Sequence, residues 1–427
     1  MRTWMWGLTS IMLLANAPVW AQSPPSSPQS DVNRSAPEPG PGDTVKSRPR
    51  PDYDPVGARL GGFFLYPEMS VTEIYRDNIF YTENNKTDDF ITVVSPKLNL
   101  KSNWNNHALN LFADMDAGFY ASNSDENYTD LRAGANGRVD IQRDMNVSGG
   151  VTVERLHEDR SSPDQTAASE PVEYVRTRPT IAFNKRFNRL STRLSGSVSD
   201  YRYDDAETAS GNTLSMEDRN RREYQGSVRV GYAFAAGYEG FVRGTANRRA
   251  YSQDTDDAGF DRSSDGWETV AGLAFDLGGV TQGNIFGGYL TQNFDDPAFE
   301  SIEGISYGGD LTWNPTRLTT VTAGAQRSVE ETTLSGASGA DSSTMELGVD
   351  HELRRNIILS GDIRYQMIDY DGISREDDVT GGGLGGSYLV NRNFRLSTRY
   401  GYATRNSNVT GGDYDTHSIR LQLTAQY

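Results

Sequence analysis

Over most of this chain, runs in which apolar and polar residues alternate are joined by connections that are short, then long, then short again. From about Gly61 onward, apolar and polar side chains alternate over runs of roughly ten residues, the length of a tilted membrane-spanning strand. In Tyr224–Phe234, for example, Val228 and Val230 alternate with Arg229. Eight short connections carry the Gly, Asn, Asp or Pro of tight turns and nine long ones are polar, so seventeen connections join eighteen strands.

Such regular alternation puts every short turn at one end of a sheet and every long loop at the other. Soluble β-sandwiches also contain alternating strands, but they do not sort their connections by length. Bacterial outer-membrane barrels do, with short periplasmic turns and long external loops. The sequence therefore predicts an all-β fold, a transmembrane antiparallel up-and-down β-barrel of about 18 strands over residues 61–427. An even strand count would place both ends of the barrel in the periplasm.

The last residues, Ser418–Tyr427, alternate most clearly and end on an aromatic side chain. Ile419 and Leu421 share one face, and polar residues such as Arg420 share the other. This ending resembles the C-terminal strand of Gram-negative outer-membrane barrels, which the barrel assembly machinery recognises. We therefore expect Tyr427 to be an assembly signal and the barrel assembly machinery to be a partner.

The first 60 residues lack the strand pattern. Arg2, an apolar run around Ile11–Ala15 and a small-residue cleavage site ending at Ala21 predict a secretory signal peptide over residues 1–21. Residues 22–60 are rich in Pro and Ser and nearly free of apolar side chains, which predicts a disordered periplasmic linker. A plain tether and a segment that holds a periplasmic partner or peptidoglycan both fit this composition.

Charge and composition exclude several classes of protein. The net charge of −17 argues against nucleic acid as a partner. The chain has no cysteine and no phosphate-loop or zinc-binding spacing, so we expect no cofactor and no metal site. Acidic residues gather in long loops such as Asp254–Asp257 and Glu376–Asp378, where they would face outward among lipopolysaccharide phosphates. Whether these loops bind Ca²⁺ stays open.

Enzymatic activity is not expected, although four histidines are available. His157 and His417 are predicted near the outer rim, close to acidic residues such as Asp159 and Asp413. A Ser-His-Asp set could be assembled from them, as it could in any polar rim. The other two, His107 and His351, are predicted near the periplasmic end.

A water-filled barrel needs a polar interior, and strand alternation assigns a mixed set of charges to the inward faces. The predicted lumen-lining residues are Arg132, Arg138, Arg178, Arg193, Arg229, Arg364, Arg395, Arg399, Arg420, Asp114, Asp116 and Asp362. Glu154, Asp310, Glu346 and Asp350 are expected on the same faces. Such ladders either select ions and sugars through a transverse field or pair and stiffen the wall. The sequence leaves both alternatives open.

The start of the expected barrel carries a set of short motifs. Gly61–Val71 is an apolar stretch containing a proline, Tyr75–Phe80 reads Tyr-Arg-Asp-Asn-Ile-Phe, and Asp-Phe-Ile and Ser-Pro-Lys-Leu follow. These motifs resemble the putative beta-barrel porin 2 family, which is found near exopolysaccharide gene clusters. The resemblance implies an outer-membrane porin, tied in some members to exopolysaccharide secretion, and brings no residue roles. From the residues themselves, Asp77 and Asn78 suit a structural corner, and Phe80 and Tyr81 suit an aromatic girdle.

Together these features predict an outer-membrane β-barrel porin, and the family resemblance implies that it is a conduit or an accessory for exopolysaccharide export. A general diffusion porin for small solutes and a non-conducting structural or adhesive barrel are the alternatives. The expected partners are outer-membrane lipid and lipopolysaccharide, the barrel assembly machinery and periplasmic components of exopolysaccharide export. The expected location is the outer membrane, with the linker and the C-terminus in the periplasm.

Overall fold

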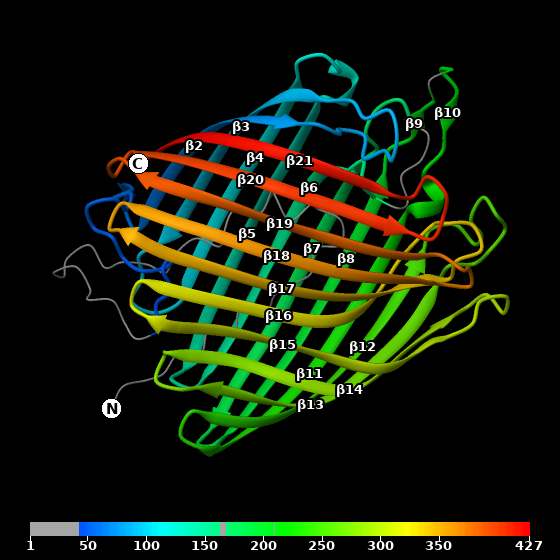
Figure 1. Cartoon of the computed structure of the whole chain (residues 1–427). Coiled ribbons are helices and arrows are strands. Elements are labelled where there is room, and N and C mark those ends of the chain that lie inside the picture. Colours follow the sequence, from blue (N-terminus) through cyan, green and yellow to red (C-terminus); the bar gives the residue numbers. More distant parts are fainter. Residues whose placement is uncertain (1–41, 163–167, 209) are drawn as a thin grey trace.

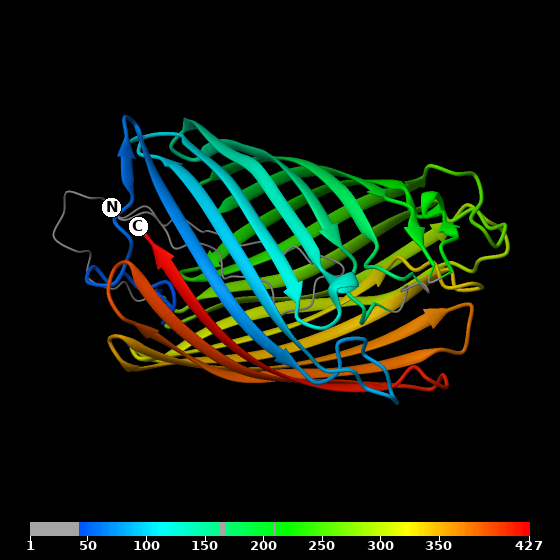
Figure 2. The same ribbon diagram turned by 90° about the horizontal axis from the view of Figure 1, so that it is seen from above.

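The computed structural model describes residues 42–162, 168–208 and 210–427, in which eighteen antiparallel strands form a closed barrel (Figure 1, Figure 2). The predicted fold class is confirmed, while the predicted signal peptide lies outside the described residues. The barrel strands are β2 (Phe63–Arg76), β3 (Asp89–Ser102), β4 (Ala108–Tyr120), β5 (Tyr128–Gln142), β6 (Met145–His157), β7 (Glu173–Phe187), β8 (Leu190–Tyr203), β11 (Arg221–Ala235), β12 (Tyr238–Tyr251), β13 (Ser264–Asp276), β14 (Thr281–Phe294), β15 (Ile302–Thr316), β16 (Thr319–Glu330), β17 (Gly339–Arg354), β18 (Ile357–Asp371), β19 (Glu376–Leu389), β20 (Phe394–Ser407) and β21 (Tyr414–Gln426).

The barrel closes where its first strand meets its last. Residues 68–76 of β2 pair with residues 418–426 of β21 in antiparallel register. Inside the barrel, the hydroxyl groups of Ser70 and Thr424 lie 3.1 Å apart across this seam, and both side chains are buried. Closure pairs the backbone groups of both edge strands, which a bilayer requires because it offers them no water.

The connections are sorted by length, as the sequence predicts. Figure 1 shows the short turns at the end that holds the C-terminus and the long loops at the opposite end. The strands are longer than predicted, however, at 12 residues for β16 and 16 for β17. As a result, the connection between β18 and β19 shrinks to residues 372–375, because Asp369 still pairs with Glu376. The hydrogen-bonded pairing of the strands thus extends into residues that the sequence predicts as loop.

Outward-facing strand positions carry exposed apolar side chains. Ile305 is 68% exposed and Leu384 is 70% exposed, and the apolar face of β21 is exposed in the same way. Such a surface suits contact with lipid rather than with water. Among the described residues, no helix combines the length and the hydropathy needed to cross a bilayer.

Smaller elements lie at the two ends. The long loops contain the 3₁₀ turns η1 (Ser124–Glu126) and η2 (Glu217–Arg219) and the hairpin β9 (Ala206–Glu207) and β10 (Thr213–Leu214). At the other end, β1 (Ala58–Leu60) pairs with the first residues of β2.

The predicted disordered linker over residues 22–60 is too long, because residues 42–60 are folded. They form turns and β1, and Val45 is fully buried. Figure 2 shows this stretch in dark blue at the same end of the barrel as the C-terminus. Residues 22–41 lie outside the described residues. We call residues 42–57 the N-terminal segment, and it packs because its basic side chains meet carboxylates of the barrel wall.

Candidate functional site

All twelve predicted lumen-lining residues lie at inward-facing strand positions, whereas their outward neighbours are exposed, as Leu131 and Ile363 show. They come from β4 (Asp114, Asp116), β5 (Arg132, Arg138), β7 (Arg178), β8 (Arg193), β11 (Arg229), β18 (Asp362, Arg364), β20 (Arg395, Arg399) and β21 (Arg420). This placement gives the barrel a charged interior. Selection of solutes by these residues stays a prediction.

A row of arginines crosses three neighbouring strands on one wall. Arg193 of β8 lies opposite Arg229 of β11, which in turn lies opposite Arg243 of β12. Glu239 binds Arg229 at 2.7 Å, and Glu268 binds Arg243 at 3.0 Å. Among the described residues, Arg193 has no ion-pair partner. Like charges directly opposite one another repel, and the two glutamates neutralise Arg229 and Arg243, so the row keeps one surplus positive charge inside the barrel, at Arg193.

The same wall continues through β7, β6 and β5. Glu154 of β6 binds Arg132 at 2.6 Å and Arg176 at 2.5 Å, and it is nearly fully buried. Next to this cluster, the Nε of Arg178 is buried and has no hydrogen-bond partner among the described residues. Arg176 is absent from the sequence-predicted set. Its spacing of two from Arg178 was the signal that could have found it.

The wall formed by β15–β17 carries the opposite charge. Asp310 of β15 and Glu346, Asp350 and Glu352 of β17 occupy inward positions. Figure 1 shows β15–β19 in front of β4–β8, so these carboxylates lie across the lumen from the arginines of β5, β7 and β8. Opposed walls of charge produce a transverse field in a water-filled lumen.

Predicted arginines near the closure seam form a second basic group. Arg399 lies opposite Arg420 in the β20–β21 ladder. Its guanidinium crosses β19 and donates to Asp362 of β18 at 2.6 Å. Gly383 of β19 lies beneath this bridge, and a Cβ there would be 2.5 Å from a terminal nitrogen of Arg399. A Cβ there would also be 2.7 Å from the backbone oxygen of Tyr400, which cannot move aside as a side chain can, so this position requires glycine.

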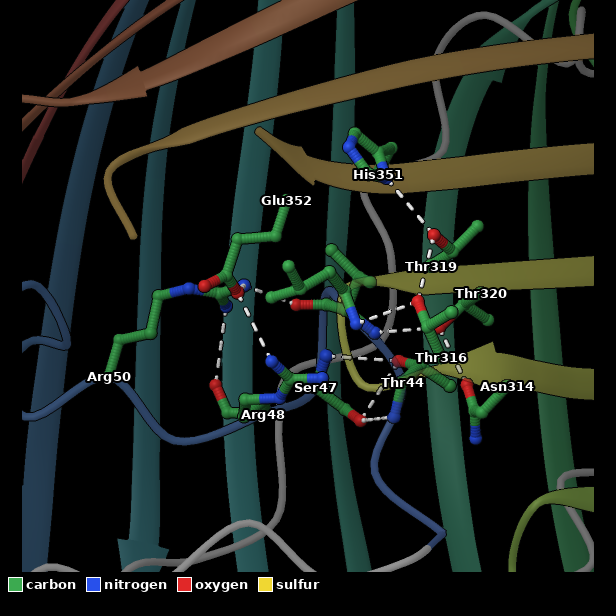
Figure 3. Close-up of polar contacts among 12 residues, drawn as sticks. Thr44, Ser47, Arg48, Arg50, Asn314, Thr316, Thr319, Thr320, His351 and Glu352 are labelled. Atoms are coloured by element: carbon green, nitrogen blue, oxygen red, sulfur yellow. Dashed lines mark hydrogen bonds and ion pairs between the residues drawn. The ribbon is translucent and has the colours of Figure 1, made fainter. Parts of the chain in front are cut away.

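The N-terminal segment docks on the acidic wall near the short-turn end (Figure 3). Glu352 accepts hydrogen bonds from Arg50 at 2.7 Å and from Arg48 at 3.4 Å. These three side chains are between 7% and 12% exposed. The backbone N–H of Val45 donates to Oγ1 of Thr320 at 2.8 Å. Both guanidinium groups and the carboxylate are largely out of water, so removal of one partner would leave a buried charge.

A third pair extends this contact into the solvent. The Nζ of Lys46 lies 2.7 Å from Asp350, and the lysine side chain is 47% exposed. The basic residues Lys46, Arg48 and Arg50 are spaced by two, as are the carboxylates Asp350 and Glu352. This matched spacing could have revealed the docking site, but the surrounding prolines favour the interpretation as a linker.

At the opposite mouth, buried ion pairs fix the long loops. Arg219 of η2 binds Glu158 at 2.9 Å, and Arg160 binds Glu126 of η1 at 2.6 Å. All four side chains are less than a tenth exposed. The loops after β4, β6 and β8 are thereby held to one another, so this rim is a defined structure in the described residues.

The predicted corner after β2 is a structural one. The amide of Asn78 is fully buried and donates to the backbone oxygens of Thr82 at 2.8 Å and Asp415 at 2.9 Å. Asp77 accepts a hydrogen bond from the backbone of β21 at 2.7 Å. The prediction that Tyr81 belongs to an aromatic girdle is wrong. Tyr81 is buried in the loop, with φ +53°, instead of facing lipid.

The four histidines lie in separate environments. Their ring partners are Asp140 for His107, Asp130 for His157, Thr319 for His351 and Tyr400 for His417. In the described residues, no histidine bridges a serine and a carboxylate through these bonds, so the geometry lends no support to a Ser-His-Asp set. The described residues also contain no group of three or more His, Asp or Glu arranged to hold a metal ion.

The closed ladder, the apolar outer surface and the charged interior define an outer-membrane β-barrel of the porin type. The chain belongs to the family described as putative beta-barrel porin 2, whose model matches residues 50–427. The resemblance drawn from the motifs after Gly61 is thereby confirmed, and the match includes part of the N-terminal segment.

Several solved structures are similar to the chain at low sequence identity. OpdK of Pseudomonas aeruginosa, crystallised with vanillate, is 14% identical, with a TM-score of 0.45, 85% of this chain covered and 99% of that chain. OpdO of the same organism is 15% identical, with a TM-score of 0.44 and coverage of 86% and 98%. A mutant of its ferric enterobactin receptor PfeA is 10% identical, with a TM-score of 0.44 and coverage of 85% and 80%. No curated protein matches the chain.

Proposed function

We propose that the protein is an outer-membrane porin through which small hydrophilic solutes diffuse, with a preference for anions. The observation that carries the proposal is the arrangement of inward charges, with arginines on β5, β7 and β8 and carboxylates across the lumen on β15–β17. Barrels of this strand number can leave an aqueous channel. Opposed charges along such a channel orient the solutes that pass and discriminate between them.

Two features favour anions over cations. Among the described residues, Arg193 lacks an ion-pair partner and the Nε of Arg178 lacks a hydrogen bond. On the acidic wall, by contrast, the N-terminal segment already supplies cations to Asp350 and Glu352. The guanidinium group of Arg193 is therefore available to bind an anion, whereas Asp350 and Glu352 already hold cations and leave Asp310 as the carboxylate of this wall without a cationic partner among the described residues.

Reversal potentials across planar bilayers in a salt gradient test this preference. The wild-type channel should favour chloride, and the combined variant Arg178→Ala and Arg193→Ala should move the selectivity toward cations. Arg155→Ala is a matched control, because Arg155 lies outside the lumen and pairs with Glu173. An unchanged reversal potential in the double variant would contradict the selectivity, and absence of any wild-type conductance would contradict the porin.

We further propose that the long loops face the exterior and that the N-terminal segment and the C-terminus face the periplasm. Support comes from the sorted connections and the acidic long loops. Single cysteines in Asp254–Asp257 or Glu376–Asp378 should react with an impermeant thiol reagent on whole cells. Cysteines at Asn188 or Arg355, in the short turns, should stay unlabelled. The reverse labelling pattern would overturn this orientation.

A narrower role, passage of an extended exopolysaccharide with periplasmic export components as partners, is a second candidate. It is favoured by the inward face of β8, where Ser191, Ser195, Ser197 and Ser199 line up and Ser195 contacts a serine of β11 at 3.0 Å. A track of hydroxyl groups offers exchangeable hydrogen bonds to sugar hydroxyls. Deletion of the gene should then trap polymer in the periplasm while precursor synthesis continues. Unchanged secretion would reject this role and leave the diffusion porin.

A further inference from the structure

A groove crosses the lipid-facing surface of β7, β8, β11 and β12. It encloses about 650 Å³, and its outward-facing lining comprises Pro179, Ile181, Gly196, Val198, Tyr224, Gly226, Ala246 and Arg248. The small residues make the hollow, since a Cβ at Gly226 would meet nothing within 4 Å. An apolar hollow in a surface that faces lipid has the right shape and chemistry for an acyl chain.

A second hollow of about 440 Å³ adjoins this groove on the side of the long loops. The two hollows share Pro179 and Val198, so they form one continuous channel on the outer surface. The far end of the second hollow is charged, with Asp200, Arg202 and Arg222 in its lining. An apolar groove therefore leads to a charged end near the rim.

Asp200 holds the two arginines side by side. It accepts the Nε–H of Arg202 at 2.9 Å and the Nε–H of Arg222 at 2.7 Å. Both bonds use Nε, which leaves terminal amino groups for a further acceptor, although Arg222 also interacts with Tyr224. The arginine side chains are 68% and 56% exposed, and the trio carries one surplus positive charge. Paired guanidinium groups match the oxygens of a phosphate.

Other arginines at this rim are already neutralised. Both terminal nitrogens of Arg248 donate to Asp295, at 2.8 Å and 2.6 Å. Arg155 donates through two nitrogens to Glu173. Each of these arginines has a carboxylate of its own, whereas Arg202 and Arg222 share one. The surplus charge at this rim thus sits where the apolar groove ends.

We propose that this groove binds a phosphorylated, acylated glycolipid of the outer leaflet, the chemistry of lipid A. One acyl chain lies along Ile181 and Gly226, and a phosphate lies between Arg202 and Arg222. The assignment rests on the orientation proposed above, which places this rim at the outer leaflet. Charge complementarity selects the occupant, because a neutral lipid would fill the groove and leave the surplus charge without a counter-ion.

Native mass spectrometry of the detergent-solubilised barrel with added lipid A tests the site. Wild-type protein should retain lipid A and bind its dephosphorylated form at least tenfold more weakly. The double variant Arg202→Ser and Arg222→Ser should lose retention by at least tenfold, and so should Gly226→Leu, which fills the groove. Gly244→Leu is the matched control, because a Cβ at Gly244 also meets nothing within 4 Å but Gly244 does not line the groove.

Equal retention by the double variant, equal binding of dephosphorylated lipid A, or tighter binding of phosphatidylglycerol would each overturn the proposal. Heat-modifiable migration in gels verifies that each variant is folded. Conductance in planar bilayers separates this site from the porin function. If the double arginine variant loses lipid A but keeps its anion selectivity, the result supports the site. If the variant still retains lipid A, the result refutes the lipid site and leaves the porin function untouched.

Discussion

Replacing Glu352 with glutamine should release the N-terminal segment from the lumen wall. The substitution keeps the size of the side chain and removes the charge that Arg48 and Arg50 both face. All three side chains are between 7% and 12% exposed, so the change breaks a mostly buried ion pair, at a cost of about 3–5 kcal/mol. Even about 3 kcal/mol lowers the ratio of docked to undocked segment about 100-fold, since about 1.4 kcal/mol is tenfold.

A single thiol can report this equilibrium. The chain has no cysteine, and Val45 is 0% exposed when the segment is docked. In a Val45→Cys background, the rate of reaction with a water-soluble maleimide measures the undocked fraction, because only that state exposes the thiol. Glu352→Gln should therefore raise this rate about 100-fold.

Asp350→Asn is the matched control on the same strand face. Its partner Lys46 is 47% exposed, and an exposed pair contributes at most about 1 kcal/mol, which corresponds to roughly a fivefold change in rate. Equal labelling rates in the Glu352 and Asp350 variants would refute the reasoning that burial decides which pair holds the segment. A Glu352 variant that labels no faster than its parent would refute the docking itself.

Three further outcomes are expected. Gly383→Val should destabilise the barrel by about 1–3 kcal/mol in urea unfolding, because its Cβ would lie 2.7 Å from the backbone oxygen of Tyr400 and would displace Arg399. Leu421→Arg, which faces lipid, should cost about 2–4 kcal/mol and impair insertion, whereas Gln422→Arg, which faces inward, should insert normally. Burial opposes ionisation of Asp256, but hydrogen bonds from its loop and from an arginine outweigh it and lower the pKa. The loop should therefore be stabilised above the ordinary carboxyl pKa and loosen, by hydrogen exchange, as pH falls below that value.

The inward placement of the predicted residues follows from strand period alone. Once Leu421 is known to face lipid, Arg420 has to face the lumen, and the same logic applies to Arg132 and Arg399. Their partners could not be predicted in this way. The reach of Arg399 across a whole strand to Asp362 depends on side-chain conformation and on the glycine beneath it, which a period of two does not specify.

The docking of residues 42–57 shows a different limit of prediction from sequence. Composition describes how a segment behaves on its own, and a proline-rich stretch with few apolar residues cannot build a core. It can still order itself against a surface that is already folded, as Arg50 does against Glu352. Such order depends on a contact between positions 302 residues apart in the chain, which local sequence patterns do not register. Tyr81 failed as a prediction for a similar reason, because its loop folds back onto β21.

The short strand β1 has a consequence for the register in which β2 and β21 pair when the barrel closes. It pairs with residues 63–65 of β2 through a turn that contains Gly61 at φ +60°, so this hairpin needs only neighbouring residues to form. The last strand reaches β2 from residue 68 onward, and the backbone N–H of Tyr427 donates to the oxygen of Pro67 at 3.2 Å.

The hairpin therefore occupies the part of the β2 edge that lies beyond the end of β21. Were β21 to slide along β2 toward the short-turn end, its final residues would collide with β1. A shift of two residues would otherwise preserve which side chains face lipid, so side-chain pattern alone does not forbid it. We therefore expect β1, three residues just before the first barrel strand, to block this shift of a final strand that is translated hundreds of positions later.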